Sequence, residues 1–82
     1  MNIRYNPDAV RSFADAPAFI QKAFIKQIGF LAVNLHHPSL RSKKYSEFDD
    51  RWQARVNKSW RFYFRIVGDT YIILDIIPHP KD

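Results

Sequence analysis

The sequence predicts an α+β fold in which a helical pair packs on one face of a small, mostly antiparallel sheet, in the order β-α-α-β-β-β. Three observations lead to this prediction: two helix starts near the N-terminus, two alternating runs between residues 51 and 66, and a long apolar strand near the end. With 82 residues, the chain is expected to form a single domain over residues 1–82.

The first elements are a short strand, Ile3-Arg4-Tyr5, and a helix over about residues 7–14. Asn6 suits the N-cap, Pro7 the first helical position, and Asp8 supplies a carboxylate to the first turn. Val10 and Phe13 are expected to face inward from this helix.

A second helix is predicted to begin at Asp15-Ala16-Pro17 and to run to about Asn34. Its apolar residues recur at three- and four-residue steps, which is the spacing of one buried helix face. They are Ile20, Phe24, Ile28, Leu31 and Leu35.

The second half of the chain predicts the sheet. Leu40 to Tyr45 is strand-like or irregular, and the acidic loop Ser46–Asp50 follows it. Two strands are expected at about 51–57 and 60–67, joined by a turn at residues 57–59.

Gly68-Asp69 is a two-residue hairpin signal before a last strand at 71–77. Such a hairpin would put Arg61 opposite Ile76. The last strand is apolar on both faces except at Asp75, which predicts a central place in the sheet. A structural partner is expected for the Asp75 carboxylate, and a role in a functional site is the alternative.

Strand alternation divides residues 60–66 between an apolar and a cationic face. Trp60, Phe62, Phe64 and Ile66 share one face, whereas Arg61, Tyr63 and Arg65 share the other. Guanidinium groups beside a phenol suit a phosphate backbone and unstacked bases, although a solvated sheet face has the same pattern.

Charge is concentrated in the same third of the chain. The formal net charge is +5, and residues 41–66 alone hold eight basic and three acidic side chains. This clustering favours a polyanionic partner, and an acidic protein would also satisfy it.

Several classes of protein are disfavoured. The chain has no cysteine, no apolar run near the ~20 residues of a membrane span and no leader-like segment, so we expect a cytoplasmic protein without a membrane partner. The adjacent His36 and His37 have no third ligand nearby in sequence, so neither a metal nor another cofactor is expected.

The pattern Trp52-x-x-Arg55-Val56-x-x-x-Trp60-Arg61-x-x-Phe64, with His79 after the last strand, resembles toxins of the RelE/ParE superfamily from bacterial type II toxin–antitoxin systems. The basic segment from His37 to Lys44 resembles the one that precedes the sheet in these toxins. The hairpin is most similar to the HigB and YoeB branches.

This resemblance implies a RelE-like fold and a ribosome-dependent endoribonuclease, an mRNA interferase that inhibits translation without a metal. The 2′-OH would attack the adjacent phosphate. Arg61 occupies the position of the phosphate-clamping arginine and His79 that of the general acid. The residues expected to bind nucleic acid are Lys43, Lys44, Arg55, Tyr63 and Arg65.

Several alternatives stay open. The general base is Lys43, Lys44, Glu47 or none of them; Arg55 contacts RNA or braces the fold; Tyr63 stacks on a base or shields the sheet. The alternative functions are a ParE-like, non-catalytic inhibitor of DNA gyrase and an inactive toxin retained as an antitoxin-binding module. The expected partners are the ribosome with its mRNA and a cognate antitoxin, which would form a toxin–antitoxin hetero-oligomer.

Overall fold

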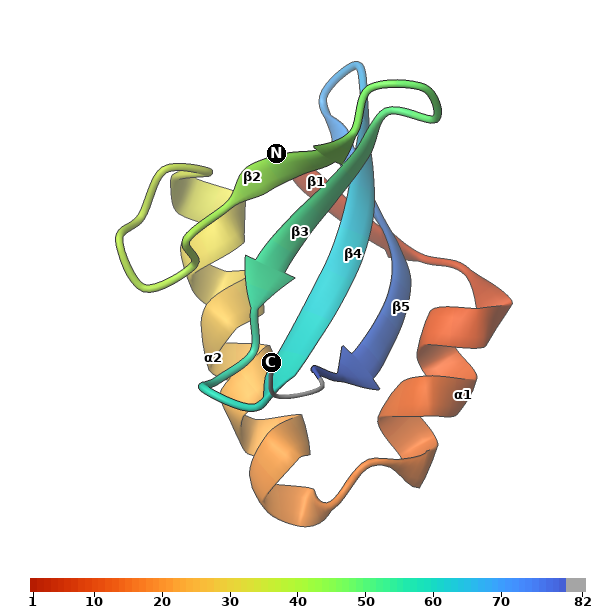
Figure 1. The fold of residues 1–82 in the computed structure, drawn as a ribbon, viewed down its shortest axis with the longest axis vertical. Coiled ribbons are helices and arrows are strands. Elements are labelled where there is room, and N and C mark those ends of the chain that lie inside the picture. The colour runs from red at the N-terminus through yellow and green to blue at the C-terminus, as the bar shows by residue number, and fades with distance from the viewer. Residues whose placement is uncertain (80–82) are drawn as a thin grey trace.

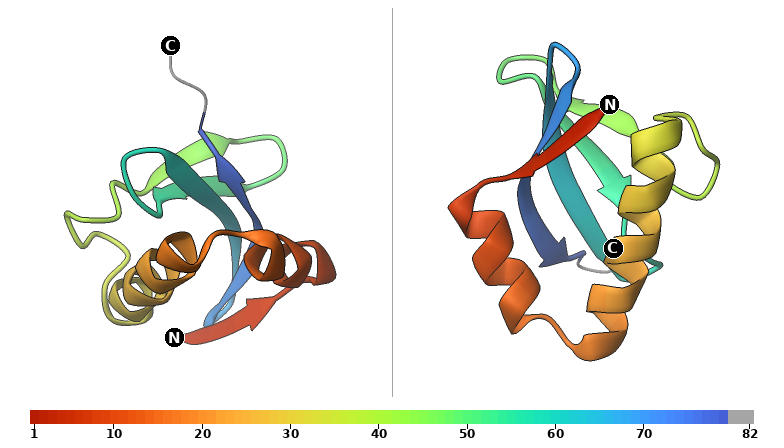
Figure 2. Two further views of the ribbon diagram at one scale, coloured as in Figure 1. Left: turned by 90° about the horizontal axis from the view of Figure 1, so that it is seen from below. Right: turned by 180° about the vertical axis from the view of Figure 1, so that it is seen from behind.

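The computed structural model describes residues 1–79, and these form two helices on one face of a five-stranded sheet, whose other face carries no helix (Figures 1 and 2). No helix within these residues is long and apolar enough to cross a bilayer. In chain order the elements are β1 (Asn2–Tyr5), α1 (Pro7–Asp15), α2 (Ala18–Val33), β2 (Lys43–Ser46), β3 (Arg51–Arg55), β4 (Trp60–Val67) and β5 (Thr70–Pro78).

The strands lie in the order β1-β5-β4-β3-β2, and only the β1–β5 pair is parallel among the described strands. The predicted α+β fold with a mostly antiparallel sheet is therefore confirmed, as is the central place of the last strand, which lies between β1 and β4. The strand-like piece that begins at Leu40 adds a strand to the predicted order, as β2. It begins only at Lys43 because Arg41 takes a left-handed backbone conformation, with φ of 47°.

Helix α1 begins as its sequence indicates. The Asn6 side chain accepts a hydrogen bond from the Ala9 amide at 2.9 Å, and Pro7 occupies the first turn. The expectation that Val10 faces inward is wrong, since Val10 is 57% exposed. Ala9 and Phe13, four residues apart, form the inward stripe instead, and Val10 lies about 100° further round the helix.

The core lies between the helices and the apolar face of the sheet. Phe62 and Phe64 of β4 are fully buried there. The Phe24 ring of α2 meets the Phe62 ring edge-on, with 5.3 Å between centroids. This packing sends the other parity of β4, beginning at Arg61, to the face without helices.

A β-bulge in β5 changes the predicted register. Phe64 pairs with Ile73 but Tyr63 pairs with Asp75, so Leu74 is the extra residue. The expectation that Arg61 lies opposite Ile76 is therefore wrong: Arg61 pairs with Ile77.

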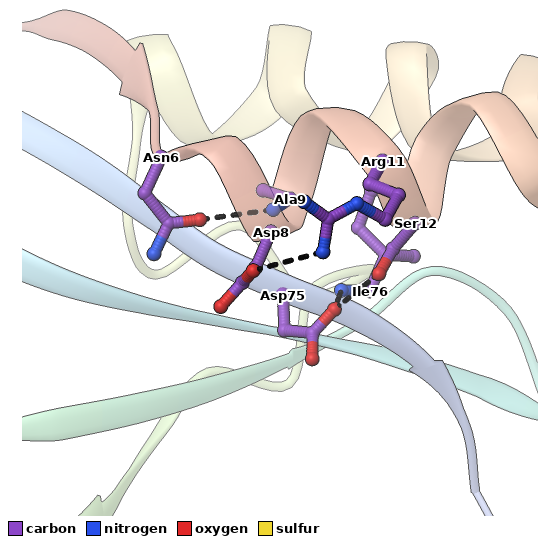
Figure 3. A network of polar contacts seen from close by, with 7 residues as sticks. All are labelled: Asn6, Asp8, Ala9, Arg11, Ser12, Asp75 and Ile76. Atoms are coloured by element: carbon purple, nitrogen blue, oxygen red, sulfur yellow. Dashed lines mark hydrogen bonds and ion pairs between the residues drawn. The ribbon is translucent and has the colours of Figure 1, made fainter.

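The Asp75 carboxylate, next to the bulge, has the structural partner that its strand predicts. The Ser12 hydroxyl of α1 donates to Asp75 Oδ1 at 2.5 Å, and the Ile76 amide donates to the same oxygen at 2.8 Å (Figure 3). The exposed pair Arg11–Asp8 lies on the same helix. The Asp75 carboxylate thus links α1 to β5 through a hydrogen bond.

Candidate nucleic-acid interface

The turn between β3 and β4 is fixed by one side chain. Asn57 Oδ1 accepts hydrogen bonds from the amides of Ser59 at 2.8 Å and Trp60 at 2.9 Å. An asparagine that bonds amides two and three residues onward reproduces a backbone turn. The turn places Arg55, at the end of β3, directly opposite Arg61, near the start of β4.

Arg61 is anchored to this turn. Its Nη1 donates to the carbonyls of Asn57 at 2.8 Å, Trp60 at 3.0 Å and Lys58 at 3.3 Å. Burial and, after it, the positive charge of Arg55 lower the pKa of the Arg61 guanidinium from its ordinary value. A guanidinium nevertheless remains charged at physiological pH, so two cations are held side by side.

His79 lies at the same end of the sheet. Its amide donates to the Ser59 carbonyl at 2.7 Å, and Pro78 pairs with Trp60. Because the bulge places Ile77 opposite Arg61, the position two residues later, His79, has the same strand parity as Arg61. We call Arg55, Lys58, Arg61 and His79 the cationic end of the sheet.

No carboxylate among residues 1–79 forms an ion pair with an arginine or lysine of the cationic end. The ion pairs in that part of the chain are Arg11–Asp8, Lys44–Glu47, Lys44–Asp50 and Arg51–Asp49. Like charges directly opposite one another in a sheet are unfavourable, so an anion bound between them would relieve that repulsion. The cationic end is therefore suited to an anionic ligand.

The two neighbouring lysines of β2 go to opposite faces. Lys43 pairs with Gln53 and is exposed on the face of Arg61, whereas Lys44 pairs with Trp52 on the helix-bearing face. Lys44 Nζ lies 5.6 Å from the Trp52 ring centroid and forms an ion pair with Asp50. The structure therefore does not bring Lys44 together with Arg61.

The other two predicted nucleic-acid contacts differ in exposure. Tyr63 is only 8% exposed, its hydroxyl bonds Gln53 Nε2 at 3.0 Å, and the Tyr45 ring covers it edge-on at 5.3 Å. Arg65 is exposed but lies four residues along β4 from Arg61, a distance of about 13 Å. Neither joins the cationic end.

Sequence reasoning missed Tyr45 as the exposed aromatic residue of this face. It is 57% exposed, whereas Tyr63 beneath it is buried. The sequence pattern around Tyr45 is a weak guide to its face, because a bulge between Lys44 and Ser46 interrupts the strand alternation.

The three candidates for a general base lie in different parts of the fold. Glu47 lies in the β2–β3 turn, at the end of the sheet opposite to the β3–β4 turn, and pairs with Lys44 at 3.9 Å (Figure 1). Of the three candidates, Lys43 is the one on the face of Arg61. His37, by contrast, stacks on Phe30 with 3.8 Å between centroids, and its Nδ1 accepts the Ser39 amide.

Metal chemistry has no evident site in residues 1–79, where no three His, Cys, Asp or Glu side chains gather in a group able to hold an ion.

Solved structures of toxins share this fold. A YoeB/ParE toxin from Agrobacterium tumefaciens is 12% identical, with a TM-score of 0.81 over 98% of this chain and 100% of that one. The archaeal RelE–RelB complex from Pyrococcus horikoshii gives 14% identity and a TM-score of 0.81, covering 99% and 97%. The YoeB–YefM complex from Staphylococcus aureus gives 14% and 0.77, covering 98% of both chains.

No curated protein matches the sequence. The sequence model of the family described as "ParE toxin of type II toxin-antitoxin system, parDE" matches residues 3–82, which is nearly the whole chain. The expected resemblance to the RelE/ParE superfamily is thereby confirmed. This chain belongs to the family of ParE toxins of type II toxin–antitoxin systems.

Proposed function

We propose that this type II toxin is a ribosome-dependent endoribonuclease, an mRNA interferase that stops translation by cleaving mRNA in the cytoplasm. The observation that carries the proposal is the gathering of Arg55, Arg61 and His79 at one end of the open sheet face. Two guanidinium groups and an imidazole are a sufficient set for transition-state charge and for leaving-group protonation in phosphate transesterification.

In the proposed reaction, the 2′-oxygen of the RNA loses its proton and attacks the adjacent phosphorus. The bond from phosphorus to the 5′-oxygen breaks, which leaves a 2′,3′-cyclic phosphate and a 5′-hydroxyl. Arg61 and Arg55 stabilise the charge on the non-bridging oxygens, and the His79 imidazolium gives its proton to the 5′-oxygen. The 2′-proton passes to a base on the same face of the sheet, and Lys43 is the candidate that lies there.

The anchoring of Arg61 supports a clamping role. Three turn carbonyls hold Nη1, so the guanidinium is oriented before any ligand binds. Electrostatic groups that need no reorganisation during the reaction are the effective ones in catalysis.

Inducible expression in a bacterial host, with growth and mRNA 5′ ends as readouts, tests this proposal. The parent chain should arrest growth and cut messages within translated regions, whereas Arg61→Gln and His79→Gln should do neither. Arg4→Gln, an exposed arginine on β1, is the charge-matched control and should behave as the parent. Growth arrest by both variants at the parent level would overturn the catalytic assignment.

A non-catalytic gyrase inhibitor is the second candidate, favoured by the match of residues 3–82 to the ParE family. The same experiment separates the two functions. Intact messages together with a DNA-damage response would support gyrase inhibition, and cleavage of translated messages would exclude it as the main activity.

We also propose a cognate antitoxin as the partner of this chain, in a hetero-oligomer. The similar folds from Pyrococcus horikoshii and Staphylococcus aureus are those of toxins in RelE–RelB and YoeB–YefM complexes. Exposed apolar side chains, such as Val10, Phe19 and Ile25 at 57%, 66% and 61%, offer surface that a partner would bury. Co-expression with the antitoxin should restore growth and give a copurifying complex, and continued lethality without copurification would contradict the proposal.

A further inference from the structure

A second cationic feature adjoins the β3–β4 turn, whose residues Asn57 and Lys58 line it. There, α2, the loop before β2 and the end of β3 enclose a groove of ≈ 460 Å³. Four basic side chains line it, together with the neutral polar residues Gln27, Ser39 and Asn57, and no carboxylate is among its lining residues. The four are Lys26, Arg41, Arg55 and Lys58, and we call this feature the cationic groove.

The cationic groove is held together by one buried amide. Gln27, 4% exposed, donates through Nε2 to the carbonyls of Ser39 at 3.0 Å and Arg55 at 2.9 Å. Its Oε1 accepts the Ser39 hydroxyl at 2.9 Å, and the Arg55 amide donates to the Leu40 carbonyl at 2.8 Å. The three segments that carry the basic side chains are therefore fixed relative to one another before a ligand arrives, which lowers the entropic cost of binding.

Arg41 carries an independent sign of function. Its φ of 47° lies in the left-handed region, which is unfavourable for a residue with a Cβ. Asp50, the other described non-glycine residue with a positive φ, has a short polar side chain of the kind that tolerates this region. An arginine has no such local reason, and strained backbone collects at binding and catalytic sites.

The cationic groove is continuous with the proposed clamp. Asn57 and Lys58 line it, and the carbonyls of the same two residues hold Arg61 Nη1. Arg55 and Lys58 belong both to the cationic end and to the cationic groove. The charge of Arg41 also contributes to lowering the pKa of Arg61, which is consistent with their proximity.

We propose that the cationic groove binds a phosphate group of the RNA chain next to the linkage held by Arg61. This rests on the proposed nuclease function and adds a path to it: the RNA backbone leaves the open sheet face at the β3–β4 turn and continues toward α2. Arginine forks match phosphate oxygens in geometry as well as in charge.

Phosphate suits the cationic groove better than an acidic polypeptide does. Its apolar lining consists of three modest side chains, Ala23, Pro38 and Val56. Polypeptide partners are usually anchored by large apolar or aromatic residues that fill pockets. A groove of basic and small side chains provides charge without such a pocket.

The test is binding of a fluorescent 2′-O-methyl hexaribonucleotide, which cannot be cleaved, at several salt concentrations. Lys26→Gln and Arg41→Gln should each raise the dissociation constant about three- to tenfold and lower the log–log salt slope by about 0.7, the value for one phosphate contact on single-stranded RNA. Lys22→Gln, on the same helix but outside the groove, is the matched control for Lys26 and should change neither quantity.

Groove variants that bind like the Lys22 control while Arg61→Gln weakens binding would overturn the groove assignment and leave the clamp intact. If the groove variants lose antitoxin copurification but keep RNA binding, the groove belongs to the partner protein and the proposal is wrong.

A second probe separates the groove from the nuclease function. The probe is inorganic pyrophosphate, titrated into the parent chain and followed by NMR. It should shift the backbone amide resonances of Ser39 and Arg41 and the side-chain amide resonance of Gln27. Such shifts in a chain that cleaves no mRNA would support a phosphate-binding groove while refuting the nuclease. Unshifted signals at millimolar pyrophosphate would overturn the groove itself.

Discussion

The two ends of the sheet contain the same kind of basic residue but treat its charge in opposite ways. One end carries the β2–β3 and β4–β5 turns (Figure 1). There, Lys44 and Arg51 form ion pairs with Asp50 and Asp49. At the cationic end, Arg55 faces Arg61 across the strands, with no ion pair to a carboxylate among residues 1–79. The paired charges contribute to the fold, whereas the unpaired charges are the ones for which we propose a ligand.

The largest effect should come from His79. His79→Gln should lower mRNA cleavage about 10²- to 10⁴-fold, the usual contribution of a general acid. The fold should persist, because the hydrogen bond to Ser59 comes from the backbone amide of residue 79 and not from the imidazole. Cleavage of a translated message by the purified variant, with circular dichroism as the folding control, measures both. Cleavage at the parent rate would remove His79 from the reaction.

Gln27→Leu tests the brace beneath the cationic end. The substitution removes the buried amide and leaves the carbonyls of Ser39 and Arg55 without their donor, which should cost about 1–3 kcal/mol of unfolding free energy. Urea denaturation measures the loss. The control is Gln21→Leu on the same helix as Gln27, which removes one hydrogen bond to the Phe13 carbonyl of α1 and should cost less. Equal losses of unfolding free energy in the two variants would mean that the Gln27 hydrogen bonds stabilise the fold no more than the single bond of Gln21 does.

Some features of this fold could be predicted from the sequence, and others could not. Helix starts, strand alternation and the central last strand depend on local chemistry, so Asn6, Pro7 and the parity of β4 could be read directly. The bulge at Leu74 could not be read, nor could which of Lys43 and Lys44 shares the face of Arg61, because both are set by pairing with other strands.

The cationic groove was out of reach for the same reason. Lys26, Arg41 and Arg55 come from a helix, a loop and a strand, and the hydrogen bonds of the Gln27 side chain join these three segments. The buried state of Tyr63 likewise depends on Tyr45, from another strand.

A smaller effect on stability is expected from removing the hydrogen bond between Ser12 and Asp75, a carboxylate of β5 near the cationic end. Asp75 is two residues before Ile77, the partner of Arg61, and it is bonded by the Ser12 hydroxyl and the Ile76 amide. Ser12→Ala should cost about 1 kcal/mol of unfolding free energy through the lost hydrogen bond. Thermal unfolding against the control Ser59→Ala, whose exposed side chain has no hydrogen bond to the described residues, checks this. A loss no larger than that of the control would show that the Ser12 bond contributes nothing.

The most direct test of the central claim is a matched pair of charge removals on β3, measured by urea unfolding and RNA binding. Arg55→Gln should raise the unfolding free energy by about 0.2–1 kcal/mol, because a like-charge pair across the strands is relieved, and should weaken RNA binding. Arg51→Gln should lower the unfolding free energy by up to about 1 kcal/mol, because its ion pair with Asp49 is lost. Opposite signs of the two stability changes are the predicted result. A loss of stability in both variants, with RNA binding unchanged in Arg55→Gln, would contradict the claim that the cationic end is kept unpaired for a ligand.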